Sequence, residues 1–356
     1  MKKIISLMML AVLGSGVLCA QERALSPINL QAEARIDYQG EYLDGMHLCD
    51  ASGFKGKYIN LMLSGDISKS FSYSYRQRLN KAHKDQTFFD ATDWIYLTYT
   101  TPNRQWSLSA GKQVVGIGGF EYDRAPINLY FCSEYWNNIA CYQFGASLTF
   151  ATKSGNDKIM FQACESPFKG SFSDLSGYGS DMYAYNLMWF GSHGWFNSLY
   201  SVNAMEYMPD EYVYYVALGN EFLFGDVGKL QLDFMNRTTD GEWLDFNNFS
   251  LMGELSFNIG QKFTAFGKAT YDVNNSDNFY DWCVMPGTDI TRLGAGVEFY
   301  PLPKGDRSVR LHAAYSHTLG ENGNILGGAL RDNQSFFTVG LTWKVDIISM
   351  TKKIFK

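Results

Sequence analysis

The residues with the clearest capacity for chemistry lie between Gly111 and Trp136, in the stretch GKQVVGIGGFEYDRAPINLYFCSEYW. Its acids Glu121 and Asp123 stand one residue apart and are followed directly by Arg124. Two such carboxylates could hold a metal ion or act as an acid–base pair, but an adjacent arginine favours ion pairs. We therefore expect no catalytic centre, metal site or cofactor site in this stretch.

Two other patterns resemble sites but lack the surroundings that the chemistry needs. Gly116-Ile117-Gly118-Gly119 is similar to a phosphate-binding loop, yet no helix is expected to follow and aim its amide groups. His312 and Ser316 share one face of an expected strand, which invites comparison with barrel enzymes that hydrolyse lipids. Those enzymes work from the lipid-facing surface, whereas this pair is expected to face inward as part of a polar wall. We expect the protein not to be an enzyme.

The first 20 residues have the form of a signal peptide. Lys2 and Lys3 precede a short apolar run from Ile4 to Leu13, and small residues lead to Ala20. Removing residues 1–20 takes away two lysines and no acid, which changes the net charge from −6 to −8. An acidic exported chain is a poor partner for nucleic acid. Residues 21–356 show no linker, so we expect one domain.

The composition points to a β-barrel in a membrane. After residue 20 no apolar run approaches the roughly 18 residues that a membrane-spanning helix needs. The chain contains 23 Tyr, 26 Phe, 8 Trp and 34 Gly, with only 8 Pro. Between Ile28 and Tyr38 apolar and polar residues alternate strictly, as in a strand with one apolar face and one polar face that contacts water. For an exported chain without a spanning helix, a closed barrel is the remaining way to cross a bilayer.

Counting such segments gives sixteen candidate strands, from Ile28–Tyr38 to Ser335–Ile347. The connections alternate in length. Most links from an odd to an even strand are long, and the links from an even to an odd strand have two to seven residues. The long links are expected at 39–56, 80–90, 116–135, 166–180, 273–288 and 320–333, with shorter ones near 207–211 and 239–246. This alternation is typical of outer-membrane barrels, which have long outer loops and tight periplasmic turns.

The third long connection, 116–135, is expected to fold into the barrel and narrow a pore. It is too long for an ordinary link and too aromatic for a disordered one. Alternation places a mixed set of charges on the inner wall. These are Arg35, Arg76, Arg78, Arg237, Lys268, Arg292, Arg310 and Lys344, together with Glu33, Asp37, Asp233, Glu254, Asp272 and Glu298.

We expect Glu121 and Asp123 to face Arg76 and Arg78 across the constriction, with Arg124 adding positive charge. Alternation places Lys112 on the apolar face of its strand, and a bulge at Gly111 would turn its side chain into the pore. The interior aromatics Trp94, Tyr96 and Tyr215 leave a saccharide preference open. The other aromatic residues are expected to form girdles at the two membrane interfaces.

Five cysteines remain after the leader: Cys49, Cys132, Cys141, Cys164 and Cys283. Their odd number and spacing fit neither a zinc site nor a redox motif. Cys141 and Cys164 could face each other on neighbouring strands, but small unpaired hydrophobic residues are the favoured interpretation.

The chain resembles the phosphate-selective porins (porin O and P family), in their Bacteroidetes branch. The resemblance covers the mature chain and depends on four segments: Gly111-Lys112-Gln113, Gly118–Ile127, Val309–Thr318 and Val339–Val345. It implies a sixteen-stranded barrel, often trimeric, whose third outer loop folds inward. The segment Thr338–Val345 also looks like the signal that barrel assembly machinery reads in a closing strand. The family name implies phosphate, but the mixed inner charges favour a general pore.

We therefore predict an outer-membrane porin for passive diffusion of small hydrophilic solutes or ions, with anions such as phosphate among the candidates. Expected partners are outer-membrane lipid, barrel assembly machinery, the diffusing solutes and, in a homotrimer, two further copies. A structural or adhesive barrel with a closed lumen is the alternative. Filling such a lumen with so many charges would demand extensive pairing.

Overall fold

The computed structural model describes residues 25–81, 87–169, 181–239, 244–325 and 328–354. The expected signal peptide lies outside these residues. The described strands form one antiparallel sheet. They are β1 (Asn29–Leu43), β2 (Met46–His47), β3 (Gly53–Asp66), β4 (Phe71–Arg78), β5 (Thr92–Thr100), β6 (Trp106–Val114), β7 (Tyr142–Ala151), β8 (Asp157–Glu165), β9 (Tyr183–His193), β10 (Phe196–Met208), β11 (Glu211–Leu223), β12 (Gly228–Thr238), β13 (Asn248–Ile259), β14 (Phe263–Asn274), β15 (Thr288–Phe299), β16 (Val309–Glu321) and β17 (Gln334–Asp346).

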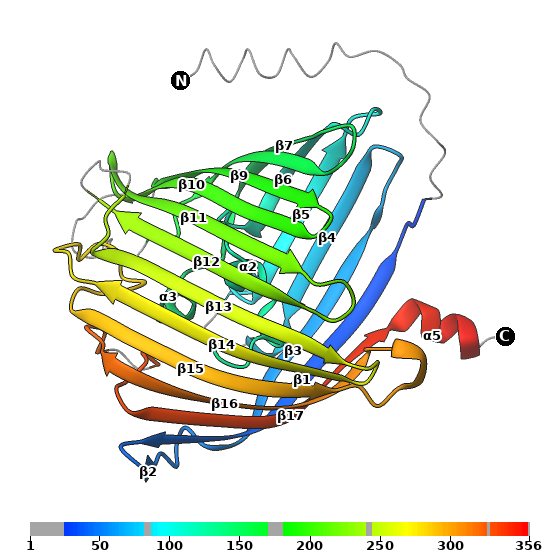
Figure 1. The fold of residues 1–356 in the computed structure, drawn as a ribbon. Helices are drawn as coiled ribbons and strands as arrows, with labels where there is room; N and C mark the ends of the chain where they lie inside the picture. Colours follow the sequence, from blue (N-terminus) through cyan, green and yellow to red (C-terminus); the bar gives the residue numbers. More distant parts are fainter. Residues whose placement is uncertain (1–24, 82–86, 170–180, 240–243, 326–327, 355–356) are drawn as a thin grey trace.

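The sheet closes on itself because β1 pairs on one side with β3 and on the other with β17. The closing ladder runs from Gln31 opposite Asp346 to Leu43 opposite Gln334. The two-residue β2 is a small hairpin within the first connection, so sixteen of the described strands form the barrel wall (Figure 1). Closure leaves no exposed strand edge. The sixteen-stranded antiparallel barrel predicted from alternation is confirmed.

The connections sort by length between the two ends of the barrel. The short turns and the helix α5 (Ile347–Ile354) lie at the right of Figure 1, and the long connections lie at the left. Two connections differ from the expected bounds. The fifth shrinks to residues 209–210, where Asp210 takes a positive φ of 64°. The first is shortened because β1 continues to Leu43 and β2 follows at once.

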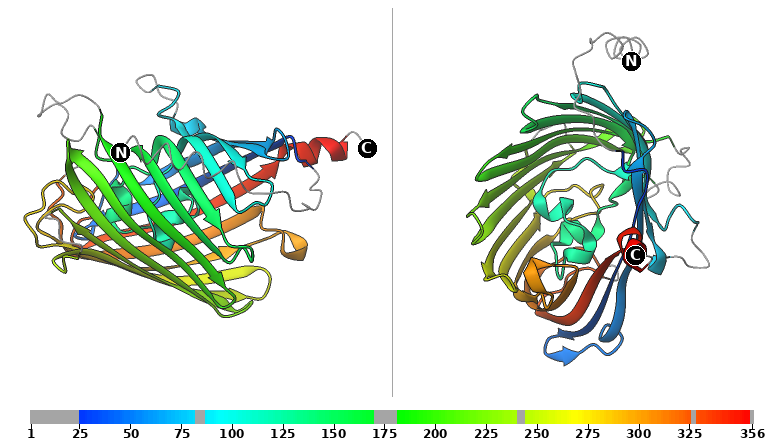
Figure 2. Two further views of the ribbon diagram at one scale, coloured as in Figure 1. Left: turned by 90° about the horizontal axis from the view of Figure 1, so that it is seen from above. Right: turned by 90° about the vertical axis from the view of Figure 1, so that its right-hand side faces the viewer.

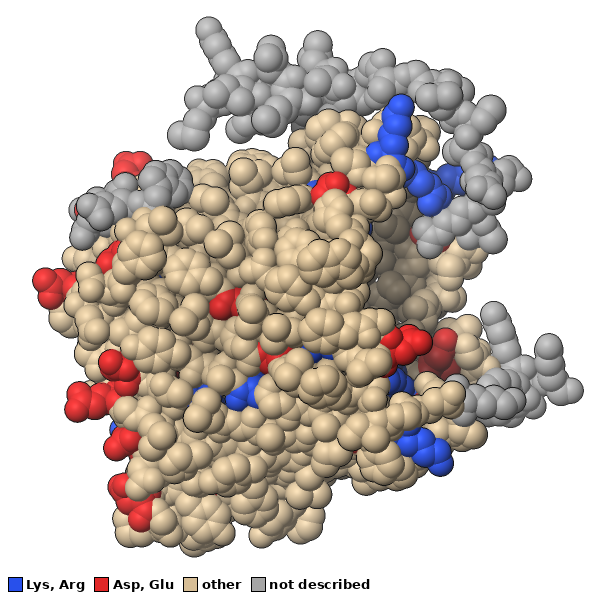
Figure 3. Space-filling view, in the orientation of Figure 1, with Lys and Arg blue, Asp and Glu red and all other residues tan. Residues whose placement is uncertain are grey.

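The outer wall is apolar and carries aromatic rows at both ends. Trp106 pairs with Phe150 at the end with the short turns, and Phe249 pairs with Tyr271 at the end with the long connections, with ring centroids 4.9 and 5.9 Å apart. Tyr315 is 52% exposed on the same outer face. Figure 3 shows that the wall over β10–β15 carries few charged side chains, while acids gather at the end with the long connections. This is the surface expected for a barrel surrounded by lipid.

The interior is filled by polar wall residues and by the third long connection. Short helices in this connection are α2 (Phe120–Asp123), η2 (Pro126–Asn128) and α3 (Glu134–Asn138). Figure 2, right, shows them inside the barrel. Towards the end with the long connections, an apolar cluster including Ile117, Tyr135, Phe168 and Val284 fills the space between this loop and one side of the wall.

The chain continues past β17 into α5, which begins where the last expected strand ends. Asp346 precedes the helix and accepts hydrogen bonds from the backbone and hydroxyl of Ser349 at 2.9 and 2.8 Å. Such side-chain bonds satisfy donors at a helix start. Across the described part of the chain, none of the helices has the length and apolarity needed to span a membrane.

Candidate functional site: an inward loop held by wall charges

The loop between β6 and β7 crosses the barrel interior from one wall to the other. Its stem is fixed by a bond from the Val115 amide to the Cys141 carbonyl, 2.8 Å long. From there the chain contacts β10 at Gly118, β12 at Glu121, β16 at Asn128 and β14 at Phe131 before it returns. The third long connection thus folds inward, as expected from the sequence.

The glycine run lets the backbone lie directly on the wall. The Gly118 amide donates to Ser201 Oγ at 2.8 Å, and the Gly119 amide donates to the Leu199 carbonyl at 3.1 Å. A Cβ on Gly118 would stand 2.7 Å from that same carbonyl oxygen. Gly119 has a φ of +100°, a conformation that side-chain-bearing residues rarely adopt. The glycines thus serve close packing against β10.

Two aspartates of the wall accept the amides at the start of the loop's short helices. Asp233 on β12 accepts from the Phe120 and Glu121 amides at 2.9 and 2.7 Å. Asp272 on β14 accepts from Glu134 and, at 3.4 Å, Tyr135. A carboxylate satisfies the unpaired donors of a helix start and is favoured there by their partial positive charge.

Four wall cations hold carbonyl groups of the segment 127–132. Arg35 donates to the Ile127 and Leu129 carbonyls at 3.2 and 2.5 Å. Lys268 donates to Phe131 and Arg292 to Cys132, at 3.1 and 3.2 Å. Arg310 binds the Asn128 side chain at 3.0 Å. Sequence alternation placed all four cations in the lumen, and the structure brings them together around the loop.

Glu121 is the buried anion of the loop. Its carboxylate lies 2.6 Å from Lys268 Nζ and accepts hydrogen bonds from the amide and hydroxyl of Ser133. Burial alone would raise the pKa of the Glu121 carboxyl, but Lys268 and Ser133 outweigh it and lower the pKa. Glu121 therefore stays ionised and ties the start of the loop to β14.

Arg124 and Asp123 lie nearer to open space. Arg124 donates to Glu254 Oε2 on β13 at 2.6 Å and also binds the Gln231 side chain. Its side chain keeps 20% of its surface exposed. Asp123 is exposed on the opposite flank of α2. Of the expected constriction residues in the loop, these two are the ones that solutes could meet.

The expected partners of Arg76 and Arg78 were wrong. Both arginines face inward on β4, as alternation predicted. They form ion pairs with Asp93 on β5, and not with the loop acids Glu121 and Asp123. The nitrogen–oxygen distances are 2.8 and 3.0 Å, and the Asp93 side chain is 2% exposed. The pairing of β4 with β5 shifts between Arg76 and Gln77, and this bulge turns Asp93 inward beside Trp94.

Lys112 does not lie in the pore. The ladder between β5 and β6 is regular through Ile95 opposite Lys112, so no bulge at Gly111 turns the side chain inward. Lys112 shares its row with the exposed residues Ile95 and Phe144 on the outer wall. Its ammonium group donates to the Phe89 carbonyl at 2.6 Å. The expectation of a lumenal Lys112 is therefore corrected.

Residues from other long connections form a cap over the inward loop. Glu134, fully buried in α3, accepts from Asn138 and Asn324 side chains and from the Leu330 amide at 2.9–3.1 Å. Arg237 on β12 pairs with Asp281 at 3.1 Å, and both side chains are fully buried. Sequence analysis placed Arg237 in the lumen but gave no role to Glu134 or Asp281, because their partners are distant in the chain.

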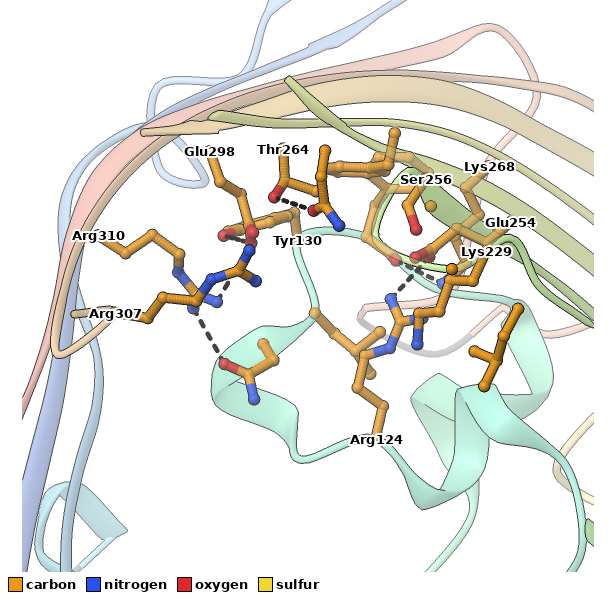
Figure 4. A pocket seen from close by; sticks show the side chains of 18 residues that line it. Arg124, Tyr130, Lys229, Glu254, Ser256, Thr264, Lys268, Glu298, Arg307 and Arg310 are labelled. Atoms are coloured by element: carbon orange, nitrogen blue, oxygen red, sulfur yellow. Dashed lines mark hydrogen bonds and ion pairs between the residues drawn. The ribbon is translucent and has the colours of Figure 1, made fainter. Parts of the chain in front are cut away.

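Two of the cavities lined by described residues lie against different parts of the wall, on opposite sides of the loop. The larger, about 420 Å³, is lined by Arg124, Lys229, Lys268, Arg307 and Arg310 together with Glu254 and Glu298 (Figure 4). We call it the cationic chamber. The second, about 300 Å³, lies against β5–β9 and includes Trp94, Tyr96 and Asp123. We call it the aromatic chamber.

Among the described residues no cluster of three or more His, Cys, Asp or Glu has the arrangement of a metal site. The five described cysteines are all free thiols. His312 lies 3.1 Å from Asp37, while Ser316 accepts a hydrogen bond from Arg292 at 3.0 Å. The two side chains thus have separate partners within the polar wall.

Comparison with known proteins agrees with this architecture. The model of the family "phosphate-selective porin O and P" matches residues 28–194. No curated protein matches the chain significantly. An anion-selective porin from Comamonas acidovorans is 12% identical, with a TM-score of 0.65 over 90% of this chain and 100% of that one.

Two further solved structures share the fold. The outer-membrane channel DcaP of Acinetobacter baumannii is 13% identical, with a TM-score of 0.59 over 91% of this chain and 99% of that one. The trimer form of OmpT, an outer membrane protein of Vibrio cholerae, is 13% identical, with a TM-score of 0.57 over 90% and 100%. Over residues 28–194 the chain is thus similar to the phosphate-selective porin O and P family, and it shares its closed sixteen-stranded barrel with solved porins and outer-membrane channels.

Proposed function

We propose that the protein is a non-enzymatic pore through which small hydrophilic solutes and ions diffuse across the outer membrane, with loop 116–135 as its constriction. The observation that carries this proposal is the placement of two cavities, each with polar or charged groups in its wall, on either side of a loop anchored by wall charges. Charged groups beside a narrow aqueous path select solutes by charge.

The cationic chamber favours a modest preference for anions. Five cations and two acids line it, but Arg124 pairs with Glu254, and Arg310 pairs with Glu298 at 3.1 Å. Lys229 and Lys268 are likewise paired, with Glu221 and Glu121. Because most of the positive charge is neutralised nearby, the field should attract anions only weakly. The anion-selective porin with a similar fold supports the same direction.

A closed structural barrel is the second candidate, and the cap favours it. The Arg237–Asp281 pair and the apolar cluster around Tyr135 and Phe168 fill part of the lumen beneath the long connections. A planar-bilayer recording distinguishes the two functions. A pore gives discrete conductance steps in KCl, whereas a closed barrel gives none in any salt.

The fold also supports proposals on the orientation of the barrel in the membrane, its oligomeric state and its assembly. We infer that the end with the short turns and α5 faces the periplasm, in line with the usual sorting of loops. A homotrimer is proposed by similarity with the trimer form of OmpT. Chemical crosslinking in native membranes tests it, since a monomeric barrel would give no crosslinked trimer. The closing strand β17 is the proposed contact for barrel assembly machinery.

A further inference from the structure

The aromatic chamber differs chemically from the cationic chamber across the loop. No lysine or arginine is among the residues that line it, and Asp123 is its one charged residue. Its wall combines the rings of Trp94, Tyr96 and Phe190 with the hydroxyls of Ser147 and Thr149. No cationic side chain in this lining attracts an anion, so the chamber suits a different class of solute.

Trp94 and Tyr96 form two successive ring surfaces. They stand two residues apart on β5, which places both on the inner face, about 7 Å from each other along the strand. The Trp94 indole is fixed at its edge by a bond from Nε1 to Ser74 Oγ, 2.9 Å long. The Arg76 guanidinium lies 3.9 Å from its ring centroid. A ring held this way loses little freedom when a ligand stacks on it.

The polar groups around these rings are mainly hydroxyls. Ser109 shares a hydrogen bond of 2.7 Å with Thr98, and Ser147 donates to Gln113 Oε1 at 2.7 Å. A hydroxyl can both donate and accept, so it matches a ligand that carries hydroxyls of its own. Val115, Ile117 and Tyr122 of the loop close the chamber on one side. Mainly apolar pockets of this size with a few polar groups are typical of small-molecule sites.

We propose that the aromatic chamber is a subsite for neutral, hydroxylated ring compounds of saccharide type, which stack on Trp94 and Tyr96 as they pass the loop. The Arg76 charge beside the indole disfavours a cationic ligand on the same ring. The proposal rests on the pore function, because the ligand reaches the chamber through the lumen. It adds a neutral solute class to the weak anion preference of the cationic chamber.

The test is block of the ionic current by maltose added to the short-turn side of channels in a planar bilayer. Wild-type channels should show current reduction that saturates with maltose concentration. The double variant Trp94→Ala/Tyr96→Ala should raise the half-blocking concentration about tenfold, because stacking is lost. Tyr99→Leu, on the lipid-facing side of the same strand, is the matched control and should behave as wild type.

The possible outcomes distinguish a failure of the saccharide subsite from a failure of the proposed pore function. Conducting channels that maltose does not block would overturn the saccharide subsite and leave the pore intact. Block by tetramethylammonium but not by maltose would show that the chamber takes cations, which also overturns it. If no channels form, binding of maltose to the subsite can still be measured by calorimetric titration. The protein is then solubilised in a detergent that carries no sugar. Binding lost in the double variant supports the subsite, and no binding to wild type refutes it.

Discussion

Lys268 on β14 and Glu121 in the inward loop form an ion pair of 2.6 Å, with 2% and 6% of their side chains exposed. The same lysine also donates to the Phe131 carbonyl, ten residues further along the loop. One wall residue therefore holds both the first and the later half of the loop. These two contacts fix the loop where the constriction is proposed.

Replacing Lys268 with Met should release the loop. Removing one member of a buried pair leaves the other charge uncompensated and typically costs about 3–5 kcal/mol. Glu121 would then move towards water, and single-channel recordings should show larger and noisier currents. The double variant Glu121→Gln/Lys268→Met is the matched control. Because it removes both charges, its single-channel current should be less noisy than that of Lys268→Met. Wild-type current and noise in Lys268→Met would show that the pair does not hold the loop.

Neutralising Arg76, Arg78 and Arg124 together to Gln should shift selectivity towards cations. The substitution leaves Asp93 and Glu254 without their partners at 2.6–3.0 Å, so the interior gains net negative charge. The reversal potential in a KCl gradient measures this shift. Asp93→Asn alone should move the potential in the opposite direction. An unchanged potential in the triple variant would place the ion path elsewhere in the lumen.

The wall was predictable from the sequence because side chains in a strand alternate with a period of two. That rule placed Arg35, Lys268, Arg292 and Arg310 correctly on the inner face. It gave no role to Asp93, where an irregularity in the ladder shifts the alternation by one residue. A bulge is a local choice of pairing, and nothing in the residue types around Asp93 marks it.

The contacts of the loop were harder to predict than its location. Its length, glycines and aromatic residues indicated an inward fold. Which wall charge meets which loop group depends on where the chain lies in space, because these partners are up to 183 residues apart in sequence. Lys112 lies on the outer wall because the ladder between β5 and β6 is regular. Sequence analysis had expected a bulge at this point.

Labelling of Cys49 on intact cells should establish the topology. Cys49 is exposed in the first long connection, whereas Cys132, Cys164 and Cys283 are buried and Cys141 is half-buried. A membrane-impermeant maleimide should therefore label the wild-type protein mainly at Cys49, and the Cys49→Ser variant should lose most of the label. Added protease should cut at 273–288, where Phe279 is 61% exposed, and at 320–333. Labelling that requires broken cells, or cleavage only at the short turns, would invert the assignment.

Replacing Asp281 with Ala should loosen the cap. Arg237 would lose its buried partner, and the Tyr215 hydroxyl would lose its acceptor at 3.0 Å. The segment around Trp282 should then be cut faster by chymotrypsin on intact cells, and the conductance should rise if the cap obstructs the path. Phe279→Ala/Asp281→Ala removes the exposed competing site at Phe279, and mass spectrometry of the fragments identifies cleavage at Trp282. Unchanged cleavage at Trp282 would show that the apolar cluster holds the cap without the ion pair.

The most direct measurement is the single-channel conductance of a variant in which residues 118–130 are replaced by a short Gly-Ser linker. The wall ladders do not include this segment, so the barrel should still assemble and resist SDS at room temperature. Wall charges such as Arg35 and Asp233 would become hydrated as the lumen opens. We predict discrete channels with a conductance clearly above that of the wild type. An assembled variant with unchanged conductance would contradict the assignment of loop 116–135 as the constriction of the pore.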